Sequence, residues 1–297
     1  MAPGSNKTIY ALGVFDGVHL GHQALLEACR HMAREAGCKA GVVTFTSHPD
    51  TLVTGKTPLL VNSVEDRQRL FSSYGIPEQV LLPFDEKLRN MPWQDFLGQL
   101  LQKGATGFVC GDDFRFGHRG EGNSQKLADF CKERGLRWGI VPGQSLGETR
   151  VSSTHIRNLL QAGQMEEACK FLGHAHLLSG QVVAGRQLGR TIGVPTANLQ
   201  IPPEVVVPKF GVYACRANVD GKSYLAVTNV GNRPTVGGHR VTVEPWLLDF
   251  EGDLYGKTLV LEFHRFLRPE KKFSSLEELK AEIQKNAAET RNFFKKS

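Results

Sequence analysis

Apolar and polar positions follow different rhythms in the two halves of the chain. In the first half, short apolar runs alternate with stretches in which apolar residues recur every three or four positions, which predicts alternating strands and helices. This alternation predicts a doubly wound parallel sheet, whose ligands bind beyond the carboxyl ends of the strands. The predicted strands are Thr8–Phe15, Ala40–Thr46, Gln79–Pro83, Gly107–Gly111 and Trp138–Pro142, and the predicted helices are Leu20–Glu35, Ser63–Tyr74, Trp93–Gln102 and Lys126–Arg134.

The second half carries short alternating runs separated by turns, starting at Gly180. Two runs joined by Asp220-Gly221 predict a β-hairpin, and two further runs continue the β pattern to Phe266. Ser275 and Glu278 form a capping box that predicts the start of a closing helix. We therefore predict an α/β plus all-β chain: a Rossmann-like parallel-sheet domain over residues 1–172, then a six-stranded antiparallel β-barrel with a C-terminal helix over residues 173–297.

Length and composition exclude several classes of protein. Of the 297 residues, 40% are hydrophobic, so the chain can bury a core and is not disordered. No apolar run approaches the roughly 18 residues that span a bilayer, and the glycines lack the three-residue period of collagen. The first residues form no apolar signal segment, and the six cysteines contain no C-x-x-C pair. These features predict a cytoplasmic protein with no membrane partner.

The net charge of +6 comes from 36 Lys and Arg against 30 Asp and Glu. A nucleic-acid-binding protein would need a clustered basic stripe with exposed aromatic residues. The densest basic positions are only Lys271-Lys272 and Lys295-Lys296. Dispersed positive charge suits small anionic substrates at least as well. Nucleic-acid binding is therefore kept as a remote alternative, and we expect no nucleic-acid partner.

A histidine pair follows the first predicted strand, in Gly13-Val-Phe-Asp-Gly-Val-His-Leu-Gly-His22. His19 and His22 are three residues apart at the expected start of a helix, so both rings can point one way. The free N–H groups and dipole of that helix favour an anion, and the small residues let a phosphate approach the backbone. A lone histidine here would usually be structural. The pair with Gly17 and Gly21 instead favours a functional anion site, and the resemblance given next implies nucleotide binding by Gly13, Phe15, Asp16, Gly17 and Gly21 besides the histidines.

This segment resembles the H-x-G-H nucleotidyltransferase superfamily, whose members transfer a nucleotidyl group without a covalent enzyme intermediate. The resemblance implies that His19 and His22 hold the triphosphate. A second segment, Val151-Ser-Ser-Thr-His-Ile-Arg157, is similar to the S-S-T-x-I-R signature of the same superfamily. Its hydroxyl groups could simply cap a helix. With the resemblance, they and the guanidinium fork become candidate phosphate ligands, namely Ser152, Ser153, Thr154 and Arg157.

A charged, aromatic loop follows the fourth predicted strand, in Cys110-Gly-Asp-Asp-Phe-Arg-Phe-Gly-His-Arg-Gly-Glu-Gly-Asn123. Two aromatic residues in such a loop are most often core anchors. The stretch resembles the G-x-D-F-R-F-G segment of bacterial-type FAD synthetases, which helps to bind flavin and nucleotide. The resemblance implies nucleotide binding by Asp113, and flavin binding by Phe114, Phe116 and Asn123. Thr44-Phe-Thr-Ser-His-Pro49 is similar to the T-F-x-x-H-P segment of that family and implies His48 on the flavin side.

The second half resembles the riboflavin kinases. Gly185-Arg-Gln-Leu-Gly-Arg-Thr-Ile-Gly-Val-Pro-Thr-Ala-Asn198 is similar to the signature that ends in P-T-A-N, and its three glycines favour a phosphate-facing loop over a simple turn. The resemblance implies that Thr196 and Asn198 hold Mg²⁺ with the phosphates of ATP, since Mg²⁺ keeps several waters and accepts phosphate oxygens. Nucleotide binding is assigned in the same way to Gly185, Arg186, Gly193 and Pro195.

Glu244 stands in Thr242-Val-Glu-Pro-Trp-Leu-Leu-Asp-Phe-Glu-Gly-Asp-Leu-Tyr-Gly-Lys257, which is similar to the kinase segment E-x-x-L-x-D-F-x-G-D-L-Y-G-K. The resemblance implies that Glu244 is the general base for the riboflavin 5′-hydroxyl. A glutamate in an apolar β-run is costly to bury without a partner or a role. Leu267-Arg-Pro-Glu-Lys-Lys-Phe273 resembles L-R-x-E-x-K-F and implies that Arg268 contacts flavin or nucleotide.

The chain departs from the family pattern in three places. Pro245-Trp246 replaces an apolar residue and a histidine, Thr46-Ser47 replaces an acidic-Pro pair, and Asn123 stands where aspartate is common. Because proline donates no ladder bond, we expect the strand to be an edge strand or bulged at Pro245. These departures motivate an alternative in which one half is degenerate and the chain has a single activity.

The resemblance covers nearly the whole chain and implies a bifunctional enzyme. The barrel with its helix would be a riboflavin kinase that makes FMN from riboflavin and ATP. The Rossmann-like domain would be an FMN adenylyltransferase, or FAD synthetase, that joins FMN to AMP from a second ATP. The ligands would be riboflavin, FMN, FAD and ATP, with Mg²⁺ as the cofactor, and we expect a monomer or weak homo-oligomer.

Overall fold

The chain is described by a computed structural model that covers residues 7–184, 193–235 and 238–296. It divides into two compact units, one of Met1–Leu60 with Arg67–Ser153 and the other of Val61–Asp66 with Thr154–Ser297. The first unit holds a parallel sheet and the second a closed antiparallel barrel, so the predicted fold class is confirmed. The domain boundary between residues 172 and 173 stays a prediction.

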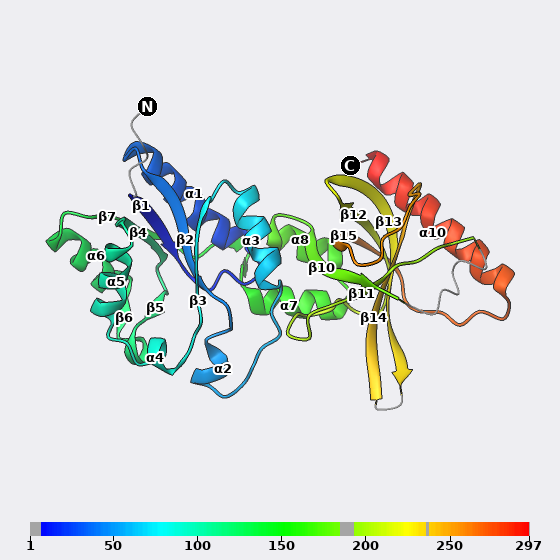
Figure 1. The fold of residues 1–297 in the computed structure, drawn as a ribbon, viewed down its shortest axis with the longest axis horizontal. Helices are drawn as coiled ribbons and strands as arrows, with labels where there is room; N and C mark the ends of the chain where they lie inside the picture. The colour runs from blue at the N-terminus through cyan, green and yellow to red at the C-terminus, as the bar shows by residue number, and fades with distance from the viewer. Residues whose placement is uncertain (1–6, 185–192, 236–237, 297) are drawn as a thin grey trace. The chain divides into compact units, whose positions relative to one another are not determined.

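The sheet of the first unit has the strand order β3-β2-β1-β4-β7, and all of its pairings are parallel (Figure 1). Both faces are covered, because every residue of β1 is buried. Tyr10 and Leu12 belong to a core cluster with α5 (Trp93–Gln102) and α6 (Ser124–Glu133). The Sγ of Cys29 on α1 (Leu20–Glu35) donates to the carbonyl of Ile9. The strands are β1 (Thr8–Leu12), β2 (Lys39–Phe45), β3 (Glu78–Leu82), β4 (Ala105–Gly111) and β7 (Arg137–Val141).

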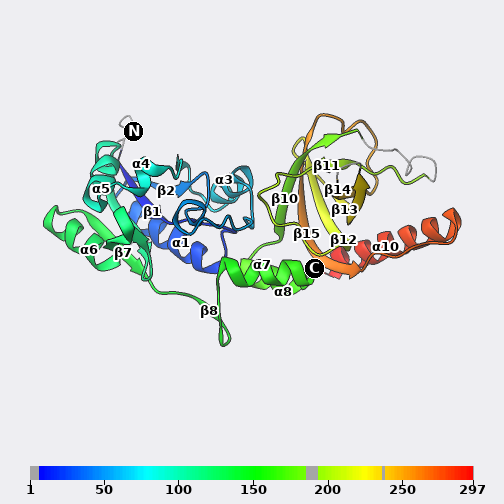
Figure 2. The same ribbon diagram turned by 90° about the horizontal axis from the view of Figure 1, so that it is seen from below.

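The helices of the first unit connect these strands at the predicted places. In α1 the buried residues Leu25, Leu26, Cys29 and Ala33 recur at helical spacing and form the face that packs on the sheet. A small hairpin of β8 and β9 projects from the unit (Figure 2). The elements are α1 (Leu20–Glu35), α2 (Asp50–Val53), α3 (Val64–Ser73, which spans both units), α4 (Glu86–Arg89), α5 (Trp93–Gln102), α6 (Ser124–Glu133), β5 (Arg115–Phe116), β6 (Gly122–Asn123), β8 (Ser145–Leu146) and β9 (Thr149–Arg150).

Two short helices open the second unit's main segment, where the sequence suggests one helical stretch from Thr154 to Leu172. They are α7 (Ser153–Ala162) and α8 (Met165–Leu172). The break falls at Gly163, whose φ of +80° lies in the left-handed region and ends α7. The amide of Gln164 donates to the carbonyl of Leu159, which closes the turn between the helices.

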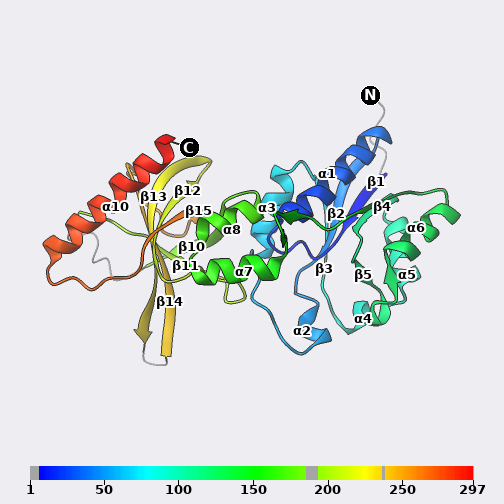
Figure 3. The same ribbon diagram turned by 180° about the vertical axis from the view of Figure 1, so that it is seen from behind.

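The barrel closes in the order β10-β11-β14-β13-β12-β15, as a six-stranded antiparallel barrel of the described residues. Strands β13 and β14 continue beyond the other strands as a long hairpin (Figure 1). Helix α10 (Leu276–Lys296) lies across the outside of the barrel against β12 and β13 (Figure 3). The strands are β10 (His176–Val183), β11 (Asn198–Gln200), β12 (Gly211–Val219), β13 (Lys222–Thr235), β14 (Gly238–Leu247) and β15 (Thr258–Arg268).

Candidate functional site

The histidine pair lies on a loop at the carboxyl end of β1. The sequence predicts a strand to Phe15, but β1 ends at Leu12. The physical reason is the backbone, because Phe15 has a φ of +54° and its carbonyl accepts a turn hydrogen bond from Val18. The chain thus turns before the histidine pair. The loop lies beyond the carboxyl ends of the strands, where ligands of such folds bind.

His19 and His22 form a stacked pair at the start of α1. His19 is the N-cap residue, and its Nδ1 accepts a hydrogen bond from the backbone N–H of His22 at 3.3 Å. The two rings are 3.6 Å apart at an angle of 10°. Burial lowers the pKa of His22 well below its usual value, and the neighbouring His19 and Arg67 lower it further. His22 Nδ1 is buried and has no hydrogen-bond partner among the described residues.

The side chain of Phe15 packs against the histidine pair and supports this loop. This side chain is fully buried, and its ring centroid lies 5.1 Å from that of His22 and 5.5 Å from that of Phe71. Val18, also fully buried, has a φ of +41°. Bulky residues in this region store about 1–3 kcal/mol each and persist only where the surroundings impose them. Phe15 is therefore a core residue here, and only its backbone could face a nucleotide.

The glycines of the loop clear space around the same rings. Gly17 has a φ of +86°, which a side chain would strain. A Cβ at Gly21 would lie 3.3 Å from the ring of His19, and one at Gly13 would lie 3.0 Å from the ring of Phe15. Asp16 is 1% exposed, between these residues. The predicted nucleotide residues of this motif therefore form one compact, tightly packed turn.

The Ser-Ser-Thr segment begins α7. The hydroxyl of Ser153 donates to the backbone carbonyl of Asp16 at 2.8 Å, which ties the start of α7 to the histidine loop. Ser152 precedes the helix and is half-buried. Thr154 and Arg157 follow on α7 in the second compact unit, Thr154 exposed and Arg157 half-buried.

The aromatic loop after β4 is partly core. Phe116 is 7% exposed, stacks on Phe114 at 5.4 Å and meets Trp93 at 6.3 Å, so it anchors the loop rather than lining its surface. Asn123 is the N-cap of α6, where its side chain accepts from the amide of Lys126 at 2.9 Å. Both side chains therefore already have structural partners, whereas Phe114 is half-buried at the edge of the cluster.

Two predicted polar residues of this unit are engaged with neighbours. Asp113 forms an ion pair with Arg150, the last residue of β9, and both side chains are mostly exposed. His48 is half-buried; its Nδ1 accepts from the amide of Asp50 at 3.1 Å and lies 3.7 Å from that carboxylate. An exposed ion pair such as that of Asp113 and Arg150 contributes about 0–1 kcal/mol, so a ligand can replace it at little cost.

The barrel brings Glu244 and Asn198 side by side. Leu199 of β11 pairs with Val243 of β14 and both are buried, so Asn198 and Glu244 lie opposite each other on the outer face. On the other side of β14, Asn229 of β13 pairs with Glu244. Directly opposite residues have Cβ atoms about 4.5–5.5 Å apart. We call Asn198, Glu244 and Asn229 the polar row.

Thr196 extends the polar row by one step. The amide of Ala197 donates to the carbonyl of Pro245, so the β11 ladder continues one residue before Asn198. Thr196 and Asn198 flank the buried Ala197 and project on the same outer face, where Thr196 is exposed. Pro195 is also exposed, and Gly193 has a φ of +74°. Gly185 and Arg186 lie outside the described residues.

Pro245 does not bulge its strand. The register between β13 and β14 runs unbroken through the Thr228–Pro245 pair. The Pro245 carbonyl accepts from the amide of Ala197, so its nitrogen also faces that side, and β11 begins only at the next residue, Asn198. Because β14 lies between β11 and β13 in the closed barrel and keeps its register, the prediction of an edge strand or a bulge at Pro245 is wrong. The barrel accommodates the proline because its missing N–H faces the point where the short strand β11 begins.

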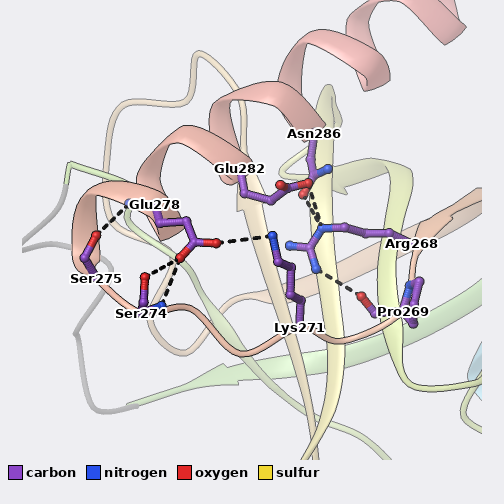
Figure 4. Close-up of polar contacts among 8 residues, drawn as sticks. All are labelled: Arg268, Pro269, Lys271, Ser274, Ser275, Glu278, Glu282 and Asn286. Carbon is purple, nitrogen blue, oxygen red and sulfur yellow. Dashed lines mark hydrogen bonds and ion pairs between the residues drawn. The ribbon is translucent and has the colours of Figure 1, made fainter.

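Arg268 is held by helix α10. Its Nε donates to Asn286 at 3.1 Å and lies 3.4 Å from Glu282, and its Nη1 donates to the carbonyl of Pro269 at 3.0 Å (Figure 4). The Glu270 carboxylate lies against Gly231, two residues along β13 from the polar row. Arg268 thus fixes the loop that follows β15 beside the row, and a flavin contact of its own stays a prediction.

Three residues near these features were not singled out from the sequence: Arg67, Arg150 and Asn229. Each can be recognised as a neighbour of a site only when the pairing of the strands is known. Asn229 becomes visible when the hairpin register is extended to β14, and Arg150 when β9 meets the loop of Asp113. Arg67 lies in a helix whose buried face looks ordinary in sequence. Across residues 7–184, 193–235 and 238–296, no three His, Cys, Asp or Glu side chains form a metal-binding group, and no helix is apolar and long enough to cross a membrane.

The architecture defines a nucleotidyltransferase-type parallel-sheet unit joined to a kinase-type barrel. The family model described as FAD synthetase matches residues 2–155, and the one described as riboflavin kinase matches residues 172–294. The chain therefore belongs to the bifunctional riboflavin kinase/FMN adenylyltransferase family and carries both of its enzyme domains, as predicted.

Relatives match nearly the full length of the chain. A bifunctional riboflavin kinase/FMN adenylyltransferase of Listeria monocytogenes is 33% identical over 97% of this chain and 93% of its own length. The protein of the same name from Escherichia coli K12 is 36% identical over 96% and 92%. A Streptococcus pneumoniae crystal structure described as a macrolide-efflux protein has 30% identity and a TM-score of 0.85, covering 98% of this chain and 95% of that one.

Proposed function

We propose that the two units catalyse successive steps at separate sites. The barrel unit would transfer the γ-phosphoryl group of ATP to the 5′-hydroxyl of riboflavin, giving FMN and ADP. The parallel-sheet unit would then join FMN to the AMP part of a second ATP, giving FAD and pyrophosphate. The observation that carries this proposal is the pair of unlike polar sites, a stacked histidine pair at a helix N-terminus and the polar row across three barrel strands.

In the barrel unit, Glu244 accepts the proton of the attacking hydroxyl. Its place at the centre of the polar row supports this role, because the flanking amides of Asn198 and Asn229 can orient the carboxylate or the substrate. Thr196 and Asn198 offer two neutral oxygens on one face and would hold Mg²⁺, which neutralises charge on the transferring phosphate. The exposure of Thr196 and the outward register of Asn198 fit such a shared site.

In the parallel-sheet unit, His19, His22 and the N-terminus of α1 bind the triphosphate. A phosphate oxygen of FMN attacks the α-phosphorus of ATP, and pyrophosphate leaves. The chain contributes position and positive potential rather than a covalent intermediate. The free, buried Nδ1 of His22 and the tight Gly17 turn support a phosphate seat at this helix start. Ser152 of the same unit would supply a further phosphate ligand, and phosphate binding by Thr154 and Arg157 stays what the family resemblance implies.

Separation of the products tests both assignments in one experiment. The purified chain is incubated with riboflavin and MgATP, and riboflavin, FMN and FAD are resolved by chromatography. Both FMN and FAD are expected, and FMN supplied without riboflavin should be converted to FAD. An accumulation of FMN with no FAD removes the adenylyltransferase assignment. A failure to make FMN, with supplied FMN still converted, removes the kinase assignment.

The remaining proposals concern the setting of the reactions. All six cysteines are free thiols, four of them buried, which supports a reducing compartment such as the cytoplasm. We propose that the chain works as a monomer or weak homo-oligomer and takes small-molecule partners rather than nucleic acid. Light scattering at increasing concentration and a nucleic-acid titration at physiological salt test these two points.

A further inference from the structure

Arg67 on α3 has a fully buried guanidinium at the carboxyl ends of β1 and β2. The residue is 1% exposed. Its Nη1 donates to the backbone carbonyl of Val14 at 2.9 Å and to Thr44 Oγ1 at 3.2 Å, and its Nη2 donates to the carbonyl of Phe45 at 2.8 Å. These three acceptors lie at the ends of the two strands beside the histidine loop.

The acceptors are themselves linked into one network. Thr44 Oγ1 donates to the carbonyl of Val14 at 2.8 Å, so Val14 is held from two directions. Val14 stands between Gly13 and Phe15, at the point where the chain leaves β1 and enters the strained turn. The direction of the Val14 carbonyl therefore sets how the loop starts toward His19 and His22.

A second residue of α3 acts on the same loop one turn later. The ring of Phe71 meets the ring of Phe15 edge-on at 5.5 Å, and Phe15 in turn lies 5.1 Å from the ring of His22. Residues four apart project from the same side of a helix. Helix α3 therefore supports the loop through a polar contact at Val14 and an apolar contact at Phe15.

A buried guanidinium contributes little net stability to a fold, because its desolvation is unfavourable. Removing such an ion from water costs several kcal/mol, and apolar residues of similar volume often replace buried charges without loss of stability. The guanidinium fork fixes the orientation of the backbone that it contacts, since its two terminal nitrogens donate to the carbonyls of Val14 and Phe45 at once. It also places a fixed positive charge close enough to His22 to help lower the pKa of that ring.

We propose that Arg67 is a positioning residue for adenylyl transfer. Its guanidinium fork fixes the Val14 carbonyl against β2 and thereby holds the loop that presents His19 and His22 to the triphosphate. The inference rests on the adenylyltransferase role proposed for the parallel-sheet unit. Arg67 is 1% exposed and donates to the Val14 carbonyl and to Thr44, so it acts through the loop.

Three variants of the full chain test this role. Arg67→Met removes charge and fork, Arg67→Lys keeps the charge but loses the fork, and Arg69→Met changes an exposed arginine of the same helix as the matched control. Conversion of FMN to FAD is measured as kcat and KM for ATP. Riboflavin phosphorylation by the same preparation reports on the barrel unit, and hydrogen exchange of the β1 and β4 amides reports whether the parallel-sheet unit is folded. The pKa of His22 is followed by NMR of labelled histidine.

Arg67→Met should lower kcat for FAD formation by about 10²-fold, the size expected when reacting groups are misplaced by about 1 Å. Arg67→Lys should recover part of that loss. Riboflavin phosphorylation by the two Arg67 variants should stay within about twofold of the unaltered chain. Both activities of Arg69→Met should do the same, as for surface substitutions. The pKa of His22 should rise in Arg67→Met, because a nearby positive charge is lost, and should stay low in Arg67→Lys.

An Arg67→Met chain that forms FAD at nearly the unaltered rate overturns the proposal. Equal loss of both activities in Arg67→Met and Arg67→Lys also overturns it, because the residue would then be a general structural support. If Arg67→Met does not fold, the lysine variant alone decides, through its kcat and the position of the His22 titration. If the unaltered chain itself makes no FAD from FMN, the proposed function has failed instead, and the His22 titration still tests the link to Arg67.

Discussion

The histidine loop and the polar row, the two proposed phosphate sites, are built in opposite ways. The histidine loop is one short segment with buried residues, positive φ angles and glycines at close approaches. The conformation of its backbone therefore determines the arrangement of the proposed site. The polar row takes one side chain from each of three strands in ordinary β conformation, so the register makes the site. A contiguous loop is easy to recognise from sequence, whereas a cross-strand row becomes visible only when the strands are paired.

The two designs should also fail differently. The histidine loop depends on supports outside the motif, such as Phe71 and Arg67, because its strained turn needs surroundings that impose it. The polar row depends on ladder hydrogen bonds that neighbouring strands share, so single side chains can be removed without displacing the others. Substitutions that remove chemistry from one unit at a time make this comparison testable.

The largest effect is expected from Glu244→Gln in the polar row. The amide keeps the size of the side chain but accepts no proton, so riboflavin phosphorylation should fall by about 10²–10⁴-fold, the range for loss of a general base. Conversion of supplied FMN to FAD should be unchanged. Both rates are measured by chromatography of the flavins. Glu262→Gln, which changes a half-buried glutamate of β15 that accepts from Asn218, is the matched control and should keep both activities.

His22→Ala tests the loop in the same way. Removal of the ring that we propose holds the triphosphate should lower FAD formation from FMN by about 10²–10³-fold, as for loss of one preorganised donor. FMN production from riboflavin should continue. His31→Ala, on an exposed position of the same helix beside Glu35, serves as the control. A folded His22→Ala chain that loses FMN production as well would show that the two sites are not separate.

Sequence patterns predicted the order of elements well, because periodicity reports which faces are buried. The helices at Leu20–Glu35 and Trp93–Gln102 have the predicted bounds. The end of β1 was wrong by three residues, because an apolar Phe15 looks like strand although its backbone has turned. Periodicity reports side-chain burial and carries no information on φ.

The site residues show the same division. The stacked histidines followed from their spacing and a helix start, which are local properties. Burial of Phe116 and the cap formed by Asn123 required knowledge of what packs against them. Arg67 and Asn229 needed the pairing of distant segments, since each gains its meaning from a strand that lies elsewhere in the chain.

Asn123→Ala sharpens the comparison within the first unit, because it separates stability from chemistry. The side chain caps α6 through the amide of Lys126, so its loss should destabilise that helix by about 1 kcal/mol. Hydrogen exchange of α6 amides should speed up by about fivefold to tenfold, the equivalent of that free energy. Asn123→Asp keeps an acceptor and should restore protection. Unchanged exchange in the alanine variant would mean that the cap contributes nothing, and a loss of FAD formation larger than the loss of protection would favour the predicted flavin contact.

The smallest effect is a pH dependence at the start of α10, in the unit whose site is built on register. Hydrogen bonds from the Ser274 amide and hydroxyl, with Lys271 nearby, lower the pKa of Glu278 from 4.5 to about 2. A carboxyl group with a depressed pKa stabilises the fold above its usual value and loses that contribution as pH falls through the lowered one. Protection of the first α10 amides, corrected for intrinsic exchange, should therefore decline between about pH 4.5 and pH 2.

The control variant for this pH dependence is Glu278→Gln, because the glutamine side chain does not titrate. In that variant the same amides should be less protected at neutral pH and should show no step over the acid range. Riboflavin phosphorylation at neutral pH should change little, because Arg268 remains bonded to Asn286 and Pro269 without Glu278. A kinase rate that followed the titration of Glu278 would instead show that the polar row depends on the loop before α10 as strongly as the histidine loop depends on α3.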